Sequence, residues 1–355
     1  MFIRDDVNSK LMNGEKKIMY HGRFKGTHYE AGYKYGCLLK KHGVVISGSP
    51  TFDITEEMKK YAAECIPQYE EYYPEVLQEI KGMADGQQSS FELLYQILFC
   101  IYCFKPQNHC TCFAFADGKN IMMGRNSDFL VSIEKLYMNC LYNLDGVYAF
   151  NGNTTAFVQM EDGVNEHGLA IGLTFIYPHI RKPGLNAGML LRYILEKCKT
   201  TKEAIDALKQ LPIASAQTLT IADSRGDLAV VECNPEKFAI IYPKKGTKYV
   251  ATANNFNSEE LKAYRTPDDI DDWKSDKRYE TAYTALNIHC EQYSLEFAQE
   301  LLGGKFGFMC QYDRKTGADT VWSVVYDLKN KKVYRVEGNP SRKKFVEDTR
   351  MKFPK

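Results

Sequence analysis

Residues 108–129 read NHCTCFAFADGKNIMMGRNSDF, and this pattern predicts two strands joined by a turn. The first part is rich in β-favouring residues, the central DGKN has the composition of a turn, and the letters after it are apolar again. A hairpin places the start of its first strand beside the end of its second, so we expect Cys110 near Arg125 and Asp128. A thiol, a guanidinium and a carboxylate at one end of a sheet are the parts of an activated cysteine nucleophile.

Length and charge limit the class of protein. The chain has 355 residues, 44% of them hydrophobic, which is enough for one large domain or two. There are 46 basic and 45 acidic residues, and no basic, aromatic-interleaved stripe indicates nucleic acid. The longest apolar stretch, Leu93–Phe104, is twelve residues long and too short to cross a bilayer. We therefore expect neither a nucleic-acid nor a membrane partner.

The cysteines and the N-terminus point to a reducing compartment. Eleven cysteines are scattered without the spacing of a disulfide framework. The first residues, MFIRDD, contain no apolar run that resembles a signal peptide. A cytoplasmic protein is the expectation.

The order of the elements predicts α+β layers. Helical patterns fill most of the first 105 residues, and Ser89 with Glu92 is expected to form a capping box that opens an apolar helix over Phe91–Phe104. After Asn108, strands are grouped with strands and helices with helices. Strands are expected at 155–160, 169–177, 217–222, 227–232, 238–242, 320–327 and 332–337, and helices at 189–198, 200–208, 279–286 and 294–302.

The opening motif resembles the start of the mature chain in N-terminal-nucleophile (Ntn) hydrolases; its residues are Cys110, Thr111, Gly124, Asn126 and Asp128. Within this class the chain most resembles the acyl-coenzyme A:6-aminopenicillanic acid acyltransferase family, with the choloylglycine hydrolases and penicillin V acylases as more distant relatives. Further matches follow in family order: GTHYEAG at 26–32, EIKGMADG at 79–86, NEHGL at 165–169, TIADSRG at 220–226 and ANNF at 253–256.

The resemblance implies an αββα sandwich preceded by a largely helical N-terminal segment. It also implies a zymogen that cleaves itself between His109 and Cys110. Residues 1–109 would be the pro-segment or α-chain, and residues 110–355 the β-chain with the nucleophile at its start. Both pieces would remain one integrated fold.

The chemistry of a processed cysteine can be worked out from its groups. A free thiol has a pKa near ~8.5 and needs a base or a positive neighbour. Cleavage would give Cys110 an α-amine with a pKa of roughly 7.7–8.0, which can accept the thiol proton. Asp128 would orient this amine, and Arg125 would supply positive charge.

An oxyanion needs fixed hydrogen-bond donors. By resemblance, Asn254 offers its side-chain amide, and the backbone N–H around Phe175 is the second donor. Arg278 stands where relatives keep a structural or substrate-facing arginine.

The function implied is an autoprocessing cysteine amidohydrolase or acyltransferase. It would act on linear C–N amide bonds of N-acyl amino acid, peptide-like or β-lactam-like substrates. The partner is a small acyl amide, no cofactor is needed because every reacting group belongs to the protein, and a homo-oligomer is left open.

Other readings of the same residues stay open. Cys112 could be a buried core residue or a second thiol, Arg125 and Asp128 could form an ordinary salt bridge, and Asn255 could replace Asn254. His109 stands where many relatives have glycine, so its side chain could crowd the cleaved bond or assist it by proton transfer.

Two alternatives come from other functional classes. The spacing of Cys100, Cys103, His109, Cys110 and Cys112 could be that of a structural zinc site. The chain could also be a non-catalytic ligand-binding protein on the same fold.

Overall fold

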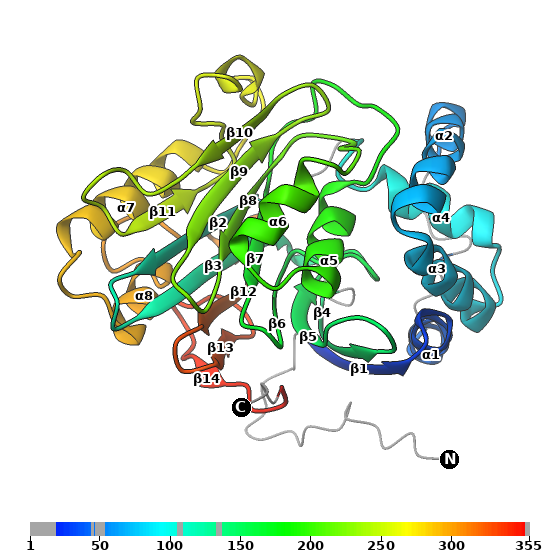
Figure 1. The fold of residues 1–355 in the computed structure, drawn as a ribbon, viewed down its shortest axis with the longest axis horizontal. Helices are drawn as coiled ribbons and strands as arrows, with labels where there is room; N and C mark the ends of the chain where they lie inside the picture. Colours follow the sequence, from blue (N-terminus) through cyan, green and yellow to red (C-terminus); the bar gives the residue numbers. More distant parts are fainter. Residues whose placement is uncertain (1–18, 44–45, 47–53, 105–108, 133–136, 352–355) are drawn as a thin grey trace.

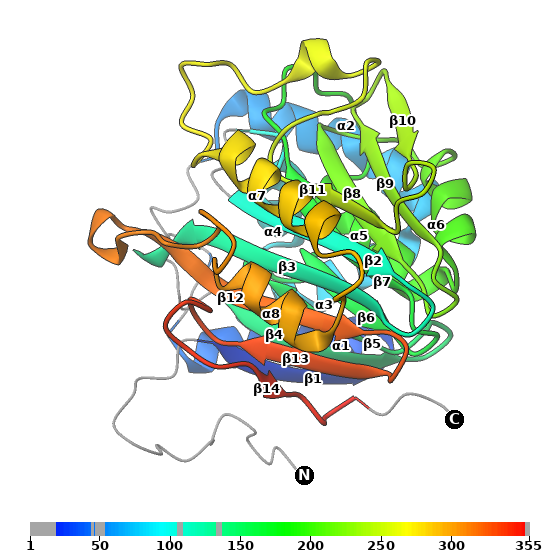
Figure 2. The same ribbon diagram turned by 90° about the vertical axis from the view of Figure 1, so that its left-hand side faces the viewer.

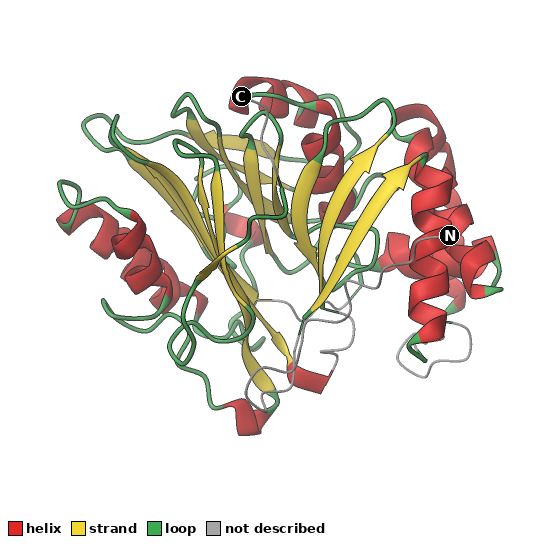
Figure 3. Ribbon diagram, turned by 90° about the horizontal axis from the view of Figure 1, so that it is seen from below, coloured by secondary structure: helices red, strands yellow, loops and turns green. Residues whose placement is uncertain are grey.

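Two β-sheets lie face to face, and helices cover the outer face of each (Figures 1 and 3). This computed structural model describes residues 19–43, 46, 54–104, 109–132 and 137–351. The predicted αββα sandwich is confirmed. In these ranges no helix has both the length and the apolar character that a membrane crossing requires.

The first sheet has eight strands in the order β1-β4-β5-β6-β7-β8-β9-β10. Strand β1 runs parallel to β4, and the other neighbours are antiparallel. Its strands are β1 (Tyr20–Gly26), β4 (Met138–Leu144), β5 (Phe150–Thr154), β6 (Asp162–Asn165), β7 (Ala170–Phe175), β8 (Gln217–Ala222), β9 (Leu228–Cys233) and β10 (Phe238–Ile241).

The second sheet is antiparallel, with the order β11-β2-β3-β12-β13-β14. The predicted hairpin, β2 with β3, lies near its centre. Its strands are β2 (His109–Ala116), β3 (Ile121–Leu130), β11 (Tyr249–Thr252), β12 (Ala318–Asp327), β13 (Lys332–Val336) and β14 (Val346–Glu347).

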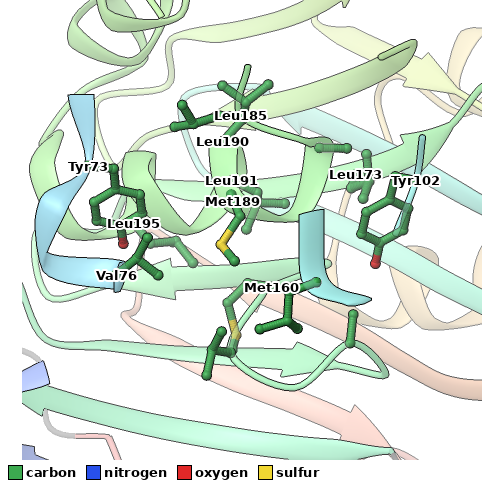
Figure 4. Close-up of a cluster of buried hydrophobic side chains, with 14 of the residues drawn as sticks. Tyr73, Val76, Tyr102, Met160, Leu173, Leu185, Met189, Leu190, Leu191 and Leu195 are labelled. Carbon is green, nitrogen blue, oxygen red and sulfur yellow. The ribbon is translucent and has the colours of Figure 1, made fainter. Parts of the chain in front are cut away.

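Helices on both outer faces complete the layers. Helices α7 (Ser275–Ile288) and α8 (Leu295–Leu302) lie across the six-stranded sheet, as Figure 2 shows. Six helices lie on the side of the eight-stranded sheet: α1 (His28–Lys41), α2 (Glu56–Tyr72), α3 (Pro74–Gln87), α4 (Phe91–Cys100), α5 (Ala187–Lys197) and α6 (Thr201–Leu208). Figure 4 shows how Tyr73, between α2 and α3, and Val76 of α3 meet Leu191 and Leu195 of α5 in one apolar cluster.

Two of the family-like stretches pack against each other. A Cβ added to Gly32 of α1 would lie 1.9 Å from the Glu79 carbonyl oxygen of α3, and one added to Gly82 of α3 would lie 2.1 Å from the Tyr29 carbonyl oxygen. Only glycine allows the two helix backbones to approach this closely. The glycines of both motifs therefore fix the contact between α1 and α3.

Alternation along β2 sorts its side chains between two cores. Cys112 and Ala114 belong to the apolar cluster between the sheets, and Phe113 and Phe115 belong to the cluster beneath α7 and α8. Cys110 has the same parity as Cys112, so its side chain is on the inter-sheet face.

Several predicted boundaries were wrong for local reasons. The α4 cap is Ser90, whose hydroxyl accepts from the Leu93 N–H, and the helix ends at Cys100 because the chain turns at Tyr102 with φ 66°. Residues 155–160 do not form a strand, since the Thr155 N–H donates to the side chain of Glu161. The sequence analysis did not predict strands β1, β4, β5, β6, β11 and β14, and β1 makes the N-terminal segment part of the eight-stranded sheet.

Candidate active site

Cys110 and Arg125 face the eight-stranded sheet from neighbouring strands. Arg125 lies opposite Cys112 in the β2–β3 register, and Cys110 is two residues before Cys112 on the same face. Nη2 of Arg125 donates to Sγ of Cys110 at 2.8 Å. The expected meeting of thiol and guanidinium is present.

Three further groups hold the Arg125 guanidinium in place. Nη1 donates to Oδ2 of Asp162 at 2.7 Å, and Nε donates to the Leu173 carbonyl at 2.9 Å. Oε2 of Glu161 lies 3.5 Å from Nη2. Arg125 is fully buried, and a buried cation is tolerated only when it is paired and hydrogen-bonded. These contacts fix the plane of the guanidinium so that an N–H of Nη2 points toward Sγ of Cys110.

The carboxylates that meet Arg125 were missed in the sequence. Glu161 and Asp162 are not among the candidate residues of the sequence analysis, yet both are fully buried. Asp162 also accepts from Nε1 of Trp322 at 2.8 Å and from the hydroxyl of Tyr326 at 2.6 Å. The signal in the sequence was a pair of adjacent acids close to the family-like stretch at 165–169. This pair does not indicate which cation the two carboxylates contact.

Asp128 lies on the other face of the six-stranded sheet. It is three residues from Arg125 along β3, and an odd separation reverses the side of a strand. Its carboxylate accepts from Oγ1 of Thr320 at 2.5 Å and from the hydroxyl of Tyr312 at 3.0 Å, and Nη1 of Arg278 is 3.9 Å away. The alternative of an Arg125–Asp128 salt bridge is therefore wrong, and the carboxylate does not share the side of the thiol.

Burial also changes the acidity of Asp128. It raises the pKa of this carboxyl to about 6, against the opposing effects of the Arg278 charge and of the Thr320 and Tyr312 hydroxyls. The carboxyl therefore changes charge close to neutral pH.

Asn254 follows β11 and contacts the main-chain nitrogen of Cys110. Its Oδ1 accepts from the Cys110 N–H at 2.9 Å and from Nη2 of Arg278 at 2.9 Å, and its Nδ2 donates to the Phe175 carbonyl at 2.7 Å. These partners fix the amide orientation, because the reverse would place N–H groups against donors. In the intact chain Oδ1 thus holds the nitrogen of the His109–Cys110 peptide bond, and Nδ2 occupies the Phe175 carbonyl.

Arg278 of α7 contacts the main chain of Cys110. Nη1 donates to the Cys110 carbonyl at 2.6 Å and to Oγ1 of Thr111 at 3.0 Å. Nη2 donates to the Asp272 carbonyl at 3.0 Å in addition to Asn254. The nitrogen, carbonyl oxygen and sulfur of Cys110 are therefore each held by a different side chain.

The thiol of Cys110 is protonated in the intact chain. Cys110 is 1% exposed, and this burial raises its pKa to about 12 although the Arg125 charge opposes the rise. Arg125 alone therefore does not make a thiolate, and a base is needed.

His109 pairs with Asp128 in the strand register, and its imidazole stacks on Trp273.

The competing residues have other contacts. Cys112 lies in the apolar cluster between the sheets, which agrees with the alternative of a buried core residue. Burial raises the pKa of its thiol to about 12. Asn255 donates from Nδ2 to Oδ1 of Asp276 at 2.5 Å, which ties it to α7.

Cys100 and Cys103, the first two of the four cysteines in the zinc alternative, lie in the core around α4. Cys100 ends that helix, and the Tyr61 hydroxyl donates to Sγ of Cys103 at 3.3 Å. In the part of the chain that the structure describes, no three His, Cys, Asp or Glu side chains gather in a way that could hold a metal ion.

The αββα layers, with a buried cysteine at the start of a central strand, are those of an Ntn-type fold. Residues 115–342 match the model of the acyl-coenzyme A:6-aminopenicillanic acid acyl-transferase family, and the chain belongs to this family. The match begins after Cys110, so it does not include this candidate residue. It does include Arg125, Asp128, Asn254 and Arg278.

Individual relatives are distant. An uncharacterized protein of Archaeoglobus fulgidus is 23% identical, and the match covers 64% of this chain but 45% of that protein, so the chain spans about half of its length. The penicillin V acylase structure from Agrobacterium tumefaciens is 18% identical, with a TM-score of 0.45 over 64% of this chain and 83% of that chain.

Two other solved structures are similar at the same level. The N-acylethanolamine-hydrolyzing acid amidase ortholog of Caenorhabditis elegans is 17% identical, with a TM-score of 0.46 over 62% of this chain and 93% of that chain. A mutant conjugated bile acid hydrolase from Clostridium perfringens is 16% identical, with a TM-score of 0.46 over 64% and 89%. These values carry no information about the substrate of this chain.

Proposed function

We propose that the chain is an autoprocessing cysteine amidohydrolase or acyltransferase that acts on linear C–N amide bonds. The observation that carries the proposal is the set of contacts around Cys110. Asn254 holds its nitrogen, Arg278 its carbonyl oxygen and Arg125 its sulfur. A cysteine that served only as core would need none of these charged and polar contacts.

The first reaction is cleavage of the bond between His109 and Cys110. The thiol adds to the His109 carbonyl carbon, the C–N bond breaks, and the released nitrogen takes the thiol proton. Water then hydrolyses the thioester, which leaves a carboxylate on His109 and a free thiol and α-amine on Cys110. Asn254 supports this step because its Oδ1 already accepts from the nitrogen that becomes the amine.

Turnover uses the new amine as the base. An α-amine has a pKa of roughly 7.7–8.0 and can take the thiol proton at neutral pH. Arg125 stabilises the charge on sulfur, and Asp128 balances the charge of the protonated amine. The substrate carbonyl oxygen then receives a hydrogen bond from Nδ2 of Asn254 in place of the Phe175 carbonyl, with the N–H around Phe175 as second donor.

The substrate class is a small acyl amide: an N-acyl amino acid, a peptide-like conjugate or a β-lactam-like compound. Every step uses groups of the protein itself, and the acyl group passes either to water or to a second amine. The processed enzyme consists of residues 1–109 and 110–355, held in one fold.

Intact-mass analysis of the purified protein, followed by a panel of acyl amides, tests the proposal. Active protein should contain a 109-residue and a 246-residue piece with Cys110 at the new N-terminus, and Cys110→Ala should remain one chain of 355 residues. Full amidase activity from an uncut chain would refute the mechanism. A chain that is never cut and turns over no acyl amide would support the ligand-binding alternative.

A further inference from the structure

The residue before the nucleophile occupies a specific aromatic site. The imidazole of His109 stacks on the indole of Trp273, with ring centroids 4.6 Å apart and an angle of 21° between the planes. We call the indole of Trp273 the Trp273 wall. Tyr312 lies at its edge, with its ring centroid 5.5 Å from that of Trp273. The flat side chain of His109, one residue before Cys110, therefore packs against the flat indole of Trp273.

The Trp273 wall is held by the same groups that hold the nucleophile. Its φ is 51° and that of Lys274 is 60°, a left-handed conformation that is costly for residues other than glycine. The Trp273 carbonyl accepts from Nε of Arg278 at 3.0 Å and from the Tyr312 hydroxyl at 3.4 Å. Arg278 also holds the Cys110 carbonyl, so the indole is fixed relative to the reacting cysteine.

The site matches the flat shape of the imidazole but does not provide a hydrogen bond for each of its ring nitrogens. Nδ1 of His109 is buried and has no hydrogen-bond partner among the residues that the structure describes, while the imidazole also hydrogen-bonds the main chain of Asp272. An unpaired buried acceptor is unfavourable, and a ring without this nitrogen avoids the cost. The stack on Trp273 is open to any flat ring, and Nδ1 of the imidazole gains no hydrogen bond from the described residues around it.

Processing and turnover pass through the same kind of intermediate. In processing, Sγ of Cys110 carries the acyl group that ends at His109; in turnover, Sγ adds to the substrate carbonyl, the C–N bond breaks, and the departing amine takes the thiol proton. Water then releases the carboxylic acid and restores the thiol. Both intermediates are thioesters of Cys110, so the first atoms of a substrate acyl group take the position of His109.

We infer that Trp273, with Tyr312 at its edge, forms the acyl subsite of the processed enzyme and selects acyl groups with a flat apolar ring on the β-carbon. Such groups are 3-arylpropanoyl amides, in which the ring is as far from the carbonyl as it is in His109. This inference rests on the proposed function. It makes Trp273 a specificity-determining residue.

The test uses processed protein and two amides of one fluorogenic amine, 3-phenylpropanoyl and nonanoyl, which have equal numbers of acyl carbons. The wild type should have a kcat/KM about ten-fold higher for the ring-bearing amide, the order expected from an aromatic stack and its buried area. Trp273→Leu should remove this preference by lowering kcat/KM for the ring-bearing amide far more than for the nonanoyl amide, and Trp273→Phe should restore part of it. Tyr242→Leu, at an exposed aromatic residue of another surface, should change neither value.

The outcomes separate the inference from the proposed function. A processed wild type that prefers nonanoyl, or a Trp273→Leu variant that loses both activities equally, overturns the subsite and leaves the amidase intact. An uncut protein without activity overturns both. If Trp273→Leu does not fold, inhibition of the wild type decides: 3-phenylpropanoic acid should inhibit at a concentration about ten-fold lower than nonanoic acid, and the reverse order rejects the inference.

Discussion

Arg278 and Cys110 are 168 residues apart in the chain, yet Nη1 of Arg278 lies 2.6 Å from the Cys110 carbonyl oxygen. Through this contact α7 on the outer layer positions a residue of the central strand β2. The same guanidinium reaches Asn254 and the carbonyls of Asp272 and Trp273. One side chain therefore links the two sides of the candidate site.

Arg278→Lys should slow processing strongly. A lysine keeps the charge but offers one ammonium where the guanidinium makes several fixed hydrogen bonds, so the Cys110 main chain loses its alignment. We expect at least a ten-fold slower cut, followed by intact mass over time. Lys277→Ala, at an exposed position one residue earlier, is the control. An unchanged rate in Arg278→Lys would mean that this contact does not position the nucleophile.

Asn254→Ala and Asn255→Ala separate catalysis from folding. Both remove hydrogen bonds of buried side chains and should lower the melting temperature by comparable amounts. Loss of an oxyanion donor typically lowers kcat by ~10²–10³, and we expect this only for Asn254→Ala. Steady-state kinetics on the processed fraction measures the difference, and equal kcat values in the two variants would remove Asn254 from the site.

Processing should depend on pH through Asp128. Its pKa of about 6, above the usual 3.8, means that roughly a tenth of it is ionised at pH 5 and about nine tenths at pH 7. If the carboxylate is the active form, the cleavage rate rises about ten-fold between these values. Asp128→Asn should be slow and should lack this step; the same pH profile in that variant would assign the titration to another group.

The raised pKa also has a consequence for stability. Since the folded state binds the Asp128 proton more tightly than the unfolded chain does, this carboxyl makes folding less favourable as pH rises from about 4 to about 6. Thermal melts of Cys110→Ala and of Cys110→Ala with Asp128→Asn should therefore converge toward pH 4. The asparagine variant should lose less stability on going to pH 7.

Alkylation distinguishes the two neighbouring thiols. Cys110 and Cys112 are both buried and protonated in the intact chain, so iodoacetamide should modify neither quickly. After processing, Cys110 should react and Cys112→Ser should keep most turnover. Peptide mapping before and after cleavage is the measurement, and an inactive Cys112→Ser beside an active Cys110→Ser would reverse the assignment.

Gly82→Ala should destabilise the fold without touching the site. The added methyl would lie 2.1 Å from the Tyr29 carbonyl oxygen, so α1 and α3 would have to separate. Overpacking of this kind typically costs about 1–3 kcal/mol and lowers the melting temperature. Gln78→Ala, exposed on the same helix, should leave it unchanged within about 0.5 kcal/mol.

The sequence predicted the parts of the fold that depend on local pattern. The β2–β3 hairpin follows from strand residues around a DGKN turn, and its register alone brings the Cys110 thiol near Arg125. The spacing alone does not give the face on which Asp128 lies: the two-residue alternation of β3 places its carboxylate on the side of the sheet opposite the thiol. Glu161 and Asp162 could not be assigned to Arg125, since the pairing crosses from one sheet to the other.

Long-range contacts limited the rest. Strand β1 is stabilised by β4, more than a hundred residues away, and nothing in its own polar sequence predicts a partner. Trp273 acquires its position through Arg278, five residues later, and through Tyr312, which is 39 residues away and a neighbour only in the folded chain. The family resemblance indicated Arg278 as a candidate residue but not its partners, which are the Cys110 carbonyl and Asn254.

The parallel pairing of β1 with β4 has a consequence for how the protein can refold. The connection between these strands runs through the His109–Cys110 bond, so the proposed cut would leave β1 and β4 on different polypeptides. Unfolding of the precursor would be a single-chain event, whereas regain of structure by the processed protein would require two chains to meet and would depend on their concentration. The lifetime of the processed enzyme would then be set by the height of its unfolding barrier rather than by an equilibrium with the unfolded state.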